Sequence, residues 1–177
     1  MLMELYDIFE QCTGVTTDSR KITEGSLFFA LHGANFDGNA FALQALEQGA
    51  AYAVVDNPKV VEDSRELEER IVVVDNTLVA LQSLAAKHRR RLEIPIIAIA
   101  GSNGKTTTKE LVSRVLSERF EVYSTHGNLN NHIGVPLTLL AMTRDTEFGV
   151  VEMGASAQGE IATLCSIAQP NYGILTN

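Results

Sequence analysis

A glycine-rich loop between an apolar strand and an amphipathic helix constrains this chain more than any other feature. The loop spans residues 100–107 and reads AGSNGKTT. The residues before it, 94–100, are continuously apolar, as in a parallel strand that is buried on both faces. Residues 107–120 have helical periodicity, which predicts a helix that packs one apolar face on a sheet. That face consists of Leu111, Val112, Val115 and Leu116. The order of strand, loop and helix predicts an α/β fold.

The loop contains the parts that bind a phosphate. Small residues such as Gly101 and Gly104 let backbone N–H groups surround an anion at the positive end of the following helix. Lys105 can reach the outer phosphates, and the Thr106 hydroxyl can bind Mg²⁺. The P-loop pattern GxxxxGK[ST] has a glycine where this chain has Ile99, so the loop is a variant. The alternative is a turn that only joins strand to helix, with Lys105 exposed. The predicted nucleotide-binding residues are Gly101, Ser102, Asn103, Gly104, Lys105, Thr106 and Thr107.

A second apolar stretch, Phe148–Met153, delivers a carboxylate near its end, that of Glu152. In P-loop proteins an acid at the carboxyl end of a neighbouring strand helps to hold Mg²⁺. We therefore predict that Thr106 and Glu152 bind the metal, and that Lys105 and Glu152 are the catalytic residues. The alternative is a carboxylate that only bonds the neighbouring turn.

The third motif is the asparagine-rich loop 127–136, which reads GNLNNHIGVP. Its proline is typical of a helix start, and polar loops after strands are where α/β proteins bind ligands. Asparagine side chains donate and accept hydrogen bonds without carrying charge, which suits a polar substrate. Asn128, Asn130 and Asn131 are the predicted substrate-binding residues of this loop. By itself, the loop is equally consistent with ordinary turn chemistry.

Short apolar stretches alternate with helical ones along the rest of the chain, as in α/β proteins. Near residue 90 the sequence changes from a basic run to a continuously apolar stretch. This change predicts two domains, 1–90 and 91–177, the second with a mostly parallel sheet. A strand at the end of the second domain leaves its sheet unfinished, so we expect the chain to be the first part of a longer protein. Strands are predicted at 26–31, 51–55, 71–74, 121–125 and 172–176; helices at 1–11, 41–48, 76–91 and 160–168; and a loop or exposed helix at 56–70.

Charge and hydropathy exclude several function classes. The formal net charge is −8, which argues against binding to nucleic acid or to an anionic membrane by bulk charge. No stretch has the roughly 18 consecutive apolar residues of a membrane helix. The acidic N-terminus lacks the basic segment of a signal peptide, so a cytoplasmic protein is expected. The basic run 88–91 is either a nucleic-acid patch or, as the net charge favours, a set of cations at a helix end.

Four motifs together resemble those of the Mur ligases. They read GSNGKTTTKE (101–110), GNLNNHIGVPLTLL (127–140), VEMGA (151–155) and ILTN (174–177). The N-terminal half is similar to the UDP-sugar-binding domain of that family, through TDSR (17–20) and LFFALHGANFDGNAF (27–41). Among the branches of the family, the motifs are most similar to the one that adds D-alanyl-D-alanine to UDP-MurNAc-tripeptide.

The resemblance implies an ATP- and Mg²⁺-dependent ligase of peptidoglycan synthesis. ATP would phosphorylate the terminal carboxylate of the UDP-MurNAc-tripeptide, and the amine of D-alanyl-D-alanine would attack the acyl phosphate. A small α/β UDP-sugar-binding domain would precede an incomplete P-loop central domain. The resemblance places Asn128, Asn130 and Asn131 between the nucleotide and the substrate carboxylate.

The resemblance also implies that Ser19 and Arg20 belong to the UDP-sugar site; the alternative is a turn with an Asp18–Arg20 surface pair. A cytoplasmic monomer is expected. The central domain of the family continues beyond TN and is followed by a C-terminal domain, so this chain alone is expected not to ligate. Open alternatives are the family branch that adds a diamino acid, a non-catalytic nucleotide-binding module and a P-loop kinase.

Overall fold

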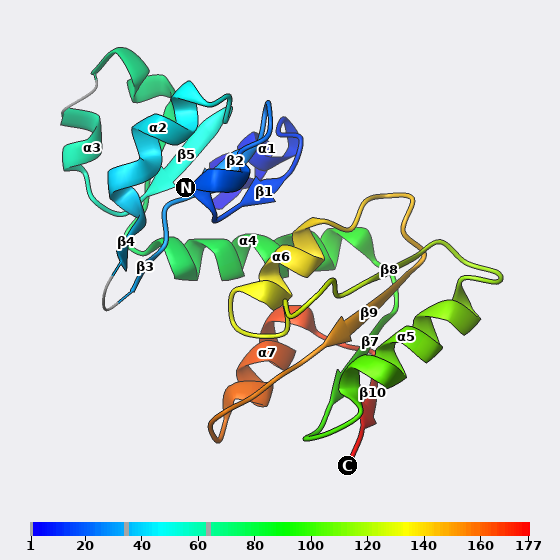
Figure 1. Cartoon of the computed structure of the whole chain (residues 1–177). Coiled ribbons are helices and arrows are strands. Elements are labelled where there is room, and N and C mark those ends of the chain that lie inside the picture. Colours follow the sequence, from blue (N-terminus) through cyan, green and yellow to red (C-terminus); the bar gives the residue numbers. More distant parts are fainter. Residues whose placement is uncertain (1, 34–35, 63–64) are drawn as a thin grey trace. The chain divides into compact units, whose positions relative to one another are not determined.

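A computed structural model describes residues 2–33, 36–62 and 65–177 and confirms the predicted α/β fold (Figure 1). The chain divides into two compact units, Met1–Leu81 and Gln82–Asn177, called here the N-terminal and C-terminal units. The division falls inside helix α4 (Thr77–Leu92). The domain boundary between residues 90 and 91, near the end of the same helix, stays a prediction. Among the described residues, no helix combines the length and the apolar character needed to cross a bilayer.

The N-terminal unit contains a parallel sheet with the strand order β1-β2-β5-β6. Its strands are β1 (Val15–Thr16), β2 (Leu27–Phe29), β5 (Tyr52–Val55) and β6 (Ile71–Val73). The last three confirm predicted strands, whereas β1 is too short to give an alternating pattern. Helices and turns surround the sheet: α1 (Leu2–Glu10), η1 (Ser19–Lys21), η2 (Gly38–Phe41), α2 (Ala42–Glu47), α3 (Lys59–Glu62) and η3 (Arg65–Arg70). A short antiparallel pair, β3 (His32–Gly33) and β4 (Phe36–Asp37), follows β2.

Small residues let α2 pack closely against this sheet. Ala42 and Ala45 of the helix and Ala53 of β5 are fully buried, so the backbones approach each other without intervening large side chains. Because the strands are parallel, the segments after β1, β2 and β5 emerge at one carboxyl edge of the sheet. The core cluster consists of Phe28, Ala30, Ala42, Ala45, Leu46, Ala50, Ala53, Val55 and Ile71.

The C-terminal unit contains a second parallel sheet with the order β10-β7-β9-β8. Helix α5 lies over one face of this sheet, and α6 and α7 lie over the other (Figure 1). The register pairs Ile99 with Glu152, so the glycine loop after β7 begins beside the end of β9. The elements are β7 (Ile96–Ala100), α5 (Lys105–Leu116), β8 (Val122–Ser124), α6 (Gly134–Leu140), β9 (Phe148–Glu152), α7 (Glu160–Ala168) and β10 (Tyr172–Leu175).

The buried face of α5 differs from the predicted one. Leu111 is 62% exposed and Val115 is 72% exposed, whereas Lys109 and Ser113 are buried. The helix is therefore rotated by about one position relative to the expected apolar stripe. Hydrogen bonds make the burial of Lys109 possible, and apolar periodicity contains no information about such bonds.

The basic run 88–91 includes two buried side chains that bind backbone carbonyls. The Arg89 guanidinium donates to Ala168 O (2.9 Å) and Gln169 O (3.1 Å) at the end of α7, and to Asn171 Oδ1 (2.9 Å). His88 Nε2 lies 2.9 Å from Met142 O. These hydrogen bonds give two of the four residues of the run a structural role in the C-terminal unit, in line with the interpretation of the run as cations at a helix end.

Replacing Arg89 with alanine is expected to lower the free energy of unfolding by about 2–3 kcal/mol, because a buried charged donor of three hydrogen bonds is lost. Urea denaturation followed by circular dichroism measures the change. Arg90 is exposed and neighbours Arg89, so Arg90→Ala is the matched control and is expected to change stability little. Equal losses in the two variants would contradict the structural role of Arg89.

Candidate functional site

The glycine loop after β7 contains two glycines with positive φ. Gly101 has φ +139° and Gly104 has φ +78°, both in the region that favours glycine. A Cβ atom on Gly101 would lie 2.2 Å from Thr176 Oγ1, so the chain after β10 packs directly on the loop. The loop ends at the first turn of α5, whose free N–H groups and dipole favour a negative charge.

Lys105 lies over this loop. Its Nζ donates to Gly101 O (2.8 Å) and to Ser102 O (3.3 Å). The ammonium is therefore held at the loop and does not extend into solvent, and the interpretation of Lys105 as merely an exposed residue loses its support. Ser102, Asn103, Thr106 and Thr107 are exposed, so a ligand can reach the loop.

Glu152 contacts residues of both other motifs, the glycine loop with its helix and the asparagine-rich loop. Its side chain is buried, at 2% exposure, at the end of β9. Thr106 Oγ1 donates to Glu152 Oε2 (3.0 Å), and Asn130 Nδ2 donates to Glu152 Oε1 (2.9 Å). One carboxylate thus connects the phosphate-loop helix with the asparagine-rich loop.

The residues at this point fit Mg²⁺. A carboxylate and a hydroxyl in direct contact are hard oxygen ligands, which Mg²⁺ prefers. Among the described residues, no cluster of three or more His, Cys, Asp or Glu side chains could hold a metal. A Mg²⁺ site with few protein ligands is usual where phosphate oxygens and water complete the shell. The Glu152 carboxylate and the Thr106 hydroxyl therefore have the chemistry and the proximity to hold a nucleotide-bound metal.

The predicted substrate residues of the asparagine-rich loop have different environments. Asn130 contacts Glu152, as described above. Asn131 Oδ1 accepts hydrogen bonds from Ile133 N (3.0 Å) and Gly134 N (2.9 Å), so it caps the start of α6. Asn128 is exposed at the tip of the loop.

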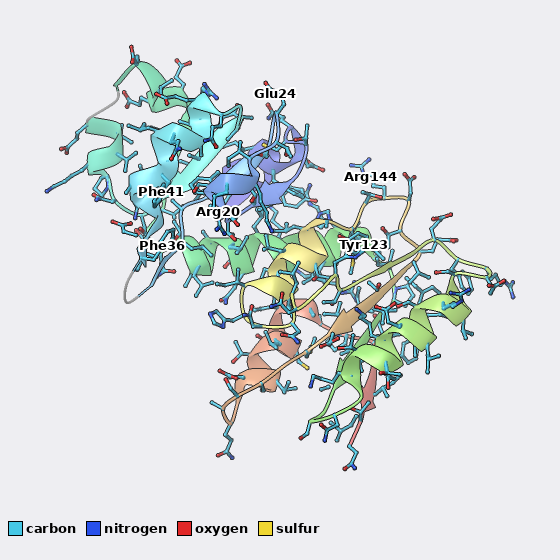
Figure 2. The ribbon with its side chains drawn as sticks, in the orientation of Figure 1. Arg20, Glu24, Phe36, Phe41, Tyr123 and Arg144 are labelled. Carbon is cyan, nitrogen blue, oxygen red and sulfur yellow. The ribbon has the colours of Figure 1, made fainter. Side chains whose placement is uncertain are left out.

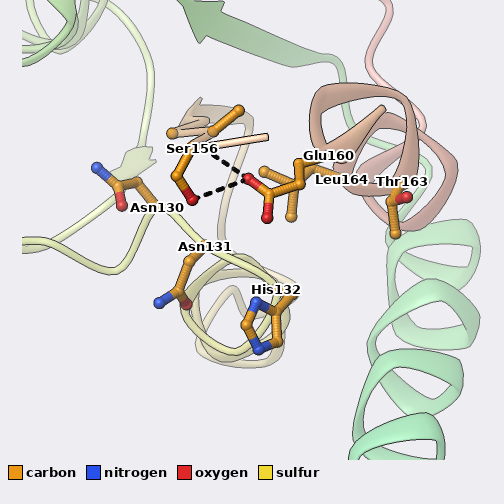
Figure 3. A pocket seen from close by; sticks show the side chains of 9 residues that line it. Asn130, Asn131, His132, Ser156, Glu160, Thr163 and Leu164 are labelled. Atoms are coloured by element: carbon orange, nitrogen blue, oxygen red, sulfur yellow. Dashed lines mark hydrogen bonds between the residues drawn. The ribbon is translucent and has the colours of Figure 1, made fainter. Parts of the chain in front are cut away.

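A cavity of about 540 Å³ adjoins this loop, and its lining includes Asn130, Asn131 and His132 on one side (Figure 3). Glu160 lies on the opposite side, at the start of α7. Its Oε2 accepts hydrogen bonds from Ser156 N (2.6 Å) and Ala157 N (3.1 Å). These bonds from Ser156 and Ala157 lower the pKa of the Glu160 carboxyl.

Sequence reasoning missed Ser156 and Glu160 as lining residues. The only signal for Glu160 was an acid at the start of a predicted helix, and acids there are common because they offset the helix dipole. Nothing in the sequence showed that the turn before α7 folds back toward the asparagine-rich loop.

In the N-terminal unit, Ser19 and Arg20 lie in η1, after β1. Asp18 caps this turn by accepting from Arg20 N (3.1 Å), and its two carboxylate oxygens bind the Arg20 guanidinium at 2.8 Å each. The side-chain hydrogen bond from Arg20 is the main reason why the pKa of Asp18 falls to about 2. The guanidinium is 86% exposed, so a ligand can reach it.

A buried polar cluster, which sequence reasoning missed, lies at the same carboxyl edge. Asp56 follows β5, and its side chain is 7% exposed. It accepts hydrogen bonds from Asn39 Nδ2 (2.9 Å) and from Thr77 N and Oγ1 (3.1 Å each), and His32 Nδ1 lies 3.0 Å away. An open cavity of about 550 Å³ adjoins it, and its wall includes Phe36, which stacks on Phe41 (Figure 2).

Replacing Asp56 with alanine is expected to lower the free energy of unfolding by about 1–3 kcal/mol at pH 7, because buried donors of Asn39 and Thr77 lose their acceptor. Burial acts to raise the pKa of Asp56, but hydrogen bonds from these residues outweigh it and the pKa is lowered. The ionised carboxylate therefore stabilises the fold above its unfolded pKa of about 4, and this contribution disappears as the pH falls through the folded pKa.

Urea denaturation at pH 7 and at pH 3 measures both effects. The difference between wild type and Asp56→Ala is expected to shrink at the lower pH. Asp75 is exposed, and Asp75→Ala is the control that removes a carboxylate without these hydrogen bonds. A difference that is the same at both pH values would contradict a stabilising role of the Asp56 charge.

Comparisons with known proteins find relatives along most of this chain. One family model, "Mur ligase family, catalytic domain", matches residues 11–89, and a second, "Mur ligase middle domain", matches residues 99–177. The UDP-N-acetylmuramoyl-tripeptide–D-alanyl-D-alanine ligase of Bacillus subtilis is 46% identical over 164 residues, which are 93% of this chain and 35% of the relative. The ligase of the same name from Synechocystis is 48% identical over 163 residues, 92% of this chain and 35% of the relative.

Solved structures show the same similarity. MurF from Acinetobacter baumannii superposes with a TM-score of 0.84 at 33% identity, covering 99% of this chain and 40% of that chain. MurF ligase from Thermotoga maritima in complex with ADP superposes with a TM-score of 0.81 at 34% identity, covering 96% of this chain and 38% of that chain. The chain therefore spans about a third of the length of its curated relatives and about two fifths of these solved chains.

Proposed function

Because this chain belongs to the Mur ligase family, we propose that it forms the sugar-nucleotide-binding and phosphate-binding part of a ligase that adds D-alanyl-D-alanine to UDP-MurNAc-tripeptide. One observation carries this proposal. Thr106 of the phosphate-loop helix and Asn130 of the asparagine-rich loop both bind the buried Glu152 carboxylate. A single point is therefore in reach of a nucleotide phosphate, a metal and a polar substrate.

Residues of the glycine loop would hold the ATP phosphates. The backbone N–H groups of Gly101, Ser102 and Gly104, with those of Lys105, Thr106 and Thr107 at the start of α5, would surround them. Asn103 N donates to Asn177 O in this structure and would have to exchange that bond for a phosphate oxygen. Lys105 would move from Gly101 O and Ser102 O to the outer phosphate oxygens, because its four-carbon stem is flexible. Thr106 and Glu152 would hold the metal. The ADP complex of the Thermotoga maritima relative supports the proposal that this chain binds a nucleotide.

The cavity beside the asparagine-rich loop would receive the end of the tripeptide. Asn130 lines this cavity, and its Nδ2 donates to Glu152 Oε1. It would therefore connect the tripeptide substrate with the metal. Asn131 would act mainly by holding α6 and the loop in place, because its carbonyl oxygen caps that helix. Asn128 would contact the substrate from the exposed tip.

The UDP-sugar would bind at the carboxyl edge of the sheet in the N-terminal unit. Carboxyl edges of parallel sheets are the usual ligand sites of α/β proteins. Ser19 and the exposed Arg20 follow β1 at this edge, and the cavity beside Asp56 lies at the same edge. An arginine suits a diphosphate because its guanidinium can bind two oxygens at once.

The resemblance to the Mur ligases implies the chemistry that these residues would serve. A carboxylate is a poor electrophile, and its phosphorylation by ATP creates an acyl phosphate with a good leaving group. The amine of the dipeptide attacks the acyl carbon, and phosphate departs. A bound Mg²⁺ would neutralise charge on the phosphoryl oxygens. Lys105 would add a second positive charge on the same oxygens, and the Asn130 amide would orient Glu152 and the substrate carboxylate.

Four further properties belong to this proposal. We place the functional boundary between the sugar-binding and phosphate-binding domains at residues 90–91, and we propose a monomer in the cytoplasm. The 177 residues alone would not ligate, because they span about a third of the length of the ligases that they match.

Phosphate release tests the proposed function. The full-length ligase that carries these residues is supplied with ATP, Mg²⁺, UDP-MurNAc-tripeptide and D-alanyl-D-alanine, and each component is omitted in turn. Release that requires all four is expected. Release that ignores the dipeptide and responds to a diamino acid would assign the chain to the other family branch. Absence of release with all components present would leave a nucleotide-binding module.

A further inference from the structure

Helix α5 has a charged residue, Lys109, at a buried position where packing alone would favour an apolar residue. Lys109 lies on the buried face of the helix at 2% exposure. Burying an ammonium removes its hydration, and an apolar residue of similar size would pack there at a lower cost. Its Nζ donates to Thr125 O (2.7 Å) and forms an ion pair with Glu110 Oε1 (2.9 Å). The charge is therefore compensated by a residue of the same helix, whereas the bond to Thr125 joins the helix to another segment.

Thr125 connects the segment after β8 to Glu152. It is fully buried, directly after β8. Its Oγ1 accepts a hydrogen bond from Glu152 N (3.0 Å), and its own N donates to Val150 O (3.0 Å). Thr125 also immediately precedes the asparagine-rich loop, whose Asn130 reaches the Glu152 carboxylate.

Helix α5 consequently contacts the Glu152 strand by two routes. Thr106 binds the carboxylate directly, and Lys109, three residues later on the same side of the helix, reaches the Glu152 backbone through Thr125. Two routes from one helix fix both the position and the direction of the carboxylate relative to the phosphate loop. Resting on the function proposed above, we infer that Lys109 is a positioning residue that sets the geometry of the metal-binding pair Thr106 and Glu152.

Nucleotide titrations of this chain, with and without Mg²⁺, test the inference. Lys109→Met keeps the length of the side chain and removes the donor to Thr125 O. The variant is expected to bind ADP without Mg²⁺ as the wild type does, since the phosphate loop is unchanged. Its apparent affinity for Mg²⁺ in the presence of ADP is expected to fall about 10- to 100-fold, which is the usual effect of removing a group that orients a metal ligand.

Two further variants separate positioning from general packing. Thr125→Val keeps the shape of the side chain and the carbonyl that Lys109 binds, but it removes the acceptor for Glu152 N; the same loss of Mg²⁺ affinity is expected. Ser113→Ala changes the next buried position of α5, where the hydroxyl has no hydrogen-bond partner, and it is expected to bind Mg²⁺ and ADP as the wild type does. Thermal unfolding of each variant reports whether the fold is retained.

Three outcomes would overturn the inference. Wild-type Mg²⁺ affinity in Lys109→Met, or in a folded Thr125→Val variant, would show that the link through Thr125 does not position Glu152. An equal loss of ADP affinity with and without Mg²⁺ in Lys109→Met would indicate general damage to the loop. If the wild-type chain itself shows no effect of Mg²⁺ on ADP binding, the proposed function fails and this inference fails with it.

Discussion

Replacing Lys105 with alanine is expected to lower phosphate release by the full-length ligase about 100- to 1,000-fold. The ammonium is already held at the glycine loop by Gly101 O and Ser102 O, so no other element has to move to bring it to a bound phosphate. Its charge interacts with oxygens on which negative charge accumulates during phosphoryl transfer. The variant is expected to keep its fold, because the two hydrogen bonds that it loses lie at the surface of the loop.

Arg114→Ala is the matched control for this prediction. Arg114 is an exposed cation on the same helix, two to three turns after Lys105, and its removal changes the net charge by the same amount. Phosphate release by this control is expected to match that of the wild type. A Lys105→Ala variant with nearly normal turnover, measured beside it, would exclude the loop as the phosphate site.

Replacing Glu152 with glutamine is expected to lower Mg²⁺-dependent phosphate release about 100-fold. The change removes the charge and almost nothing else. The glutamine oxygen can still accept from Asn130 Nδ2, and its amide can donate to Thr106 Oγ1, because a hydroxyl is both a donor and an acceptor. The buried network thus remains satisfied, and thermal stability is expected to be equal to or higher than that of the wild type, since a buried negative charge is gone.

The distinguishing measurement for Glu152→Gln is the Mg²⁺ concentration that gives half-maximal release. It is expected to rise strongly in the variant. A variant that needs the same Mg²⁺ concentration as the wild type would show that Glu152 has only a structural role. That outcome would favour the alternative given by the sequence, in which this carboxylate only forms hydrogen bonds to neighbouring residues.

The sequence predicted those features that depend on local pattern. The apolar runs at β7 and β9 predicted two strands, which the structure confirms. The glycine loop after β7 predicted a phosphate site, and that site stays a prediction. Because parallel strands bring their carboxyl ends to one edge, the proximity of the glycine loop to Glu152 could be expected from the motifs alone. The contact of Thr106 with Glu152 follows from the same geometry.

Features that depend on tertiary hydrogen bonds could not be predicted. The burial of Lys109 contradicts its hydropathy and becomes possible only with the carbonyl of Thr125 beside it. The hydrogen bonds by which Asn131 holds the start of α6 could not be predicted either, because asparagine suits a helix cap and a substrate ligand equally, and its substrate role stays a prediction. The burial of Asp56 depends on Asn39 and Thr77, which lie 17 and 21 residues away.

The central claim is that the glycine loop, Thr106 and Glu152 form one site for a nucleotide phosphate and its metal. Calorimetric titration of the 177-residue chain with ADP, in the presence and in the absence of Mg²⁺, tests this claim most directly. We expect binding at a single site, tighter with Mg²⁺, with the Mg²⁺-dependent gain lost in Glu152→Gln. Binding that is unaffected by Mg²⁺, or a gain that persists in Glu152→Gln, would contradict it.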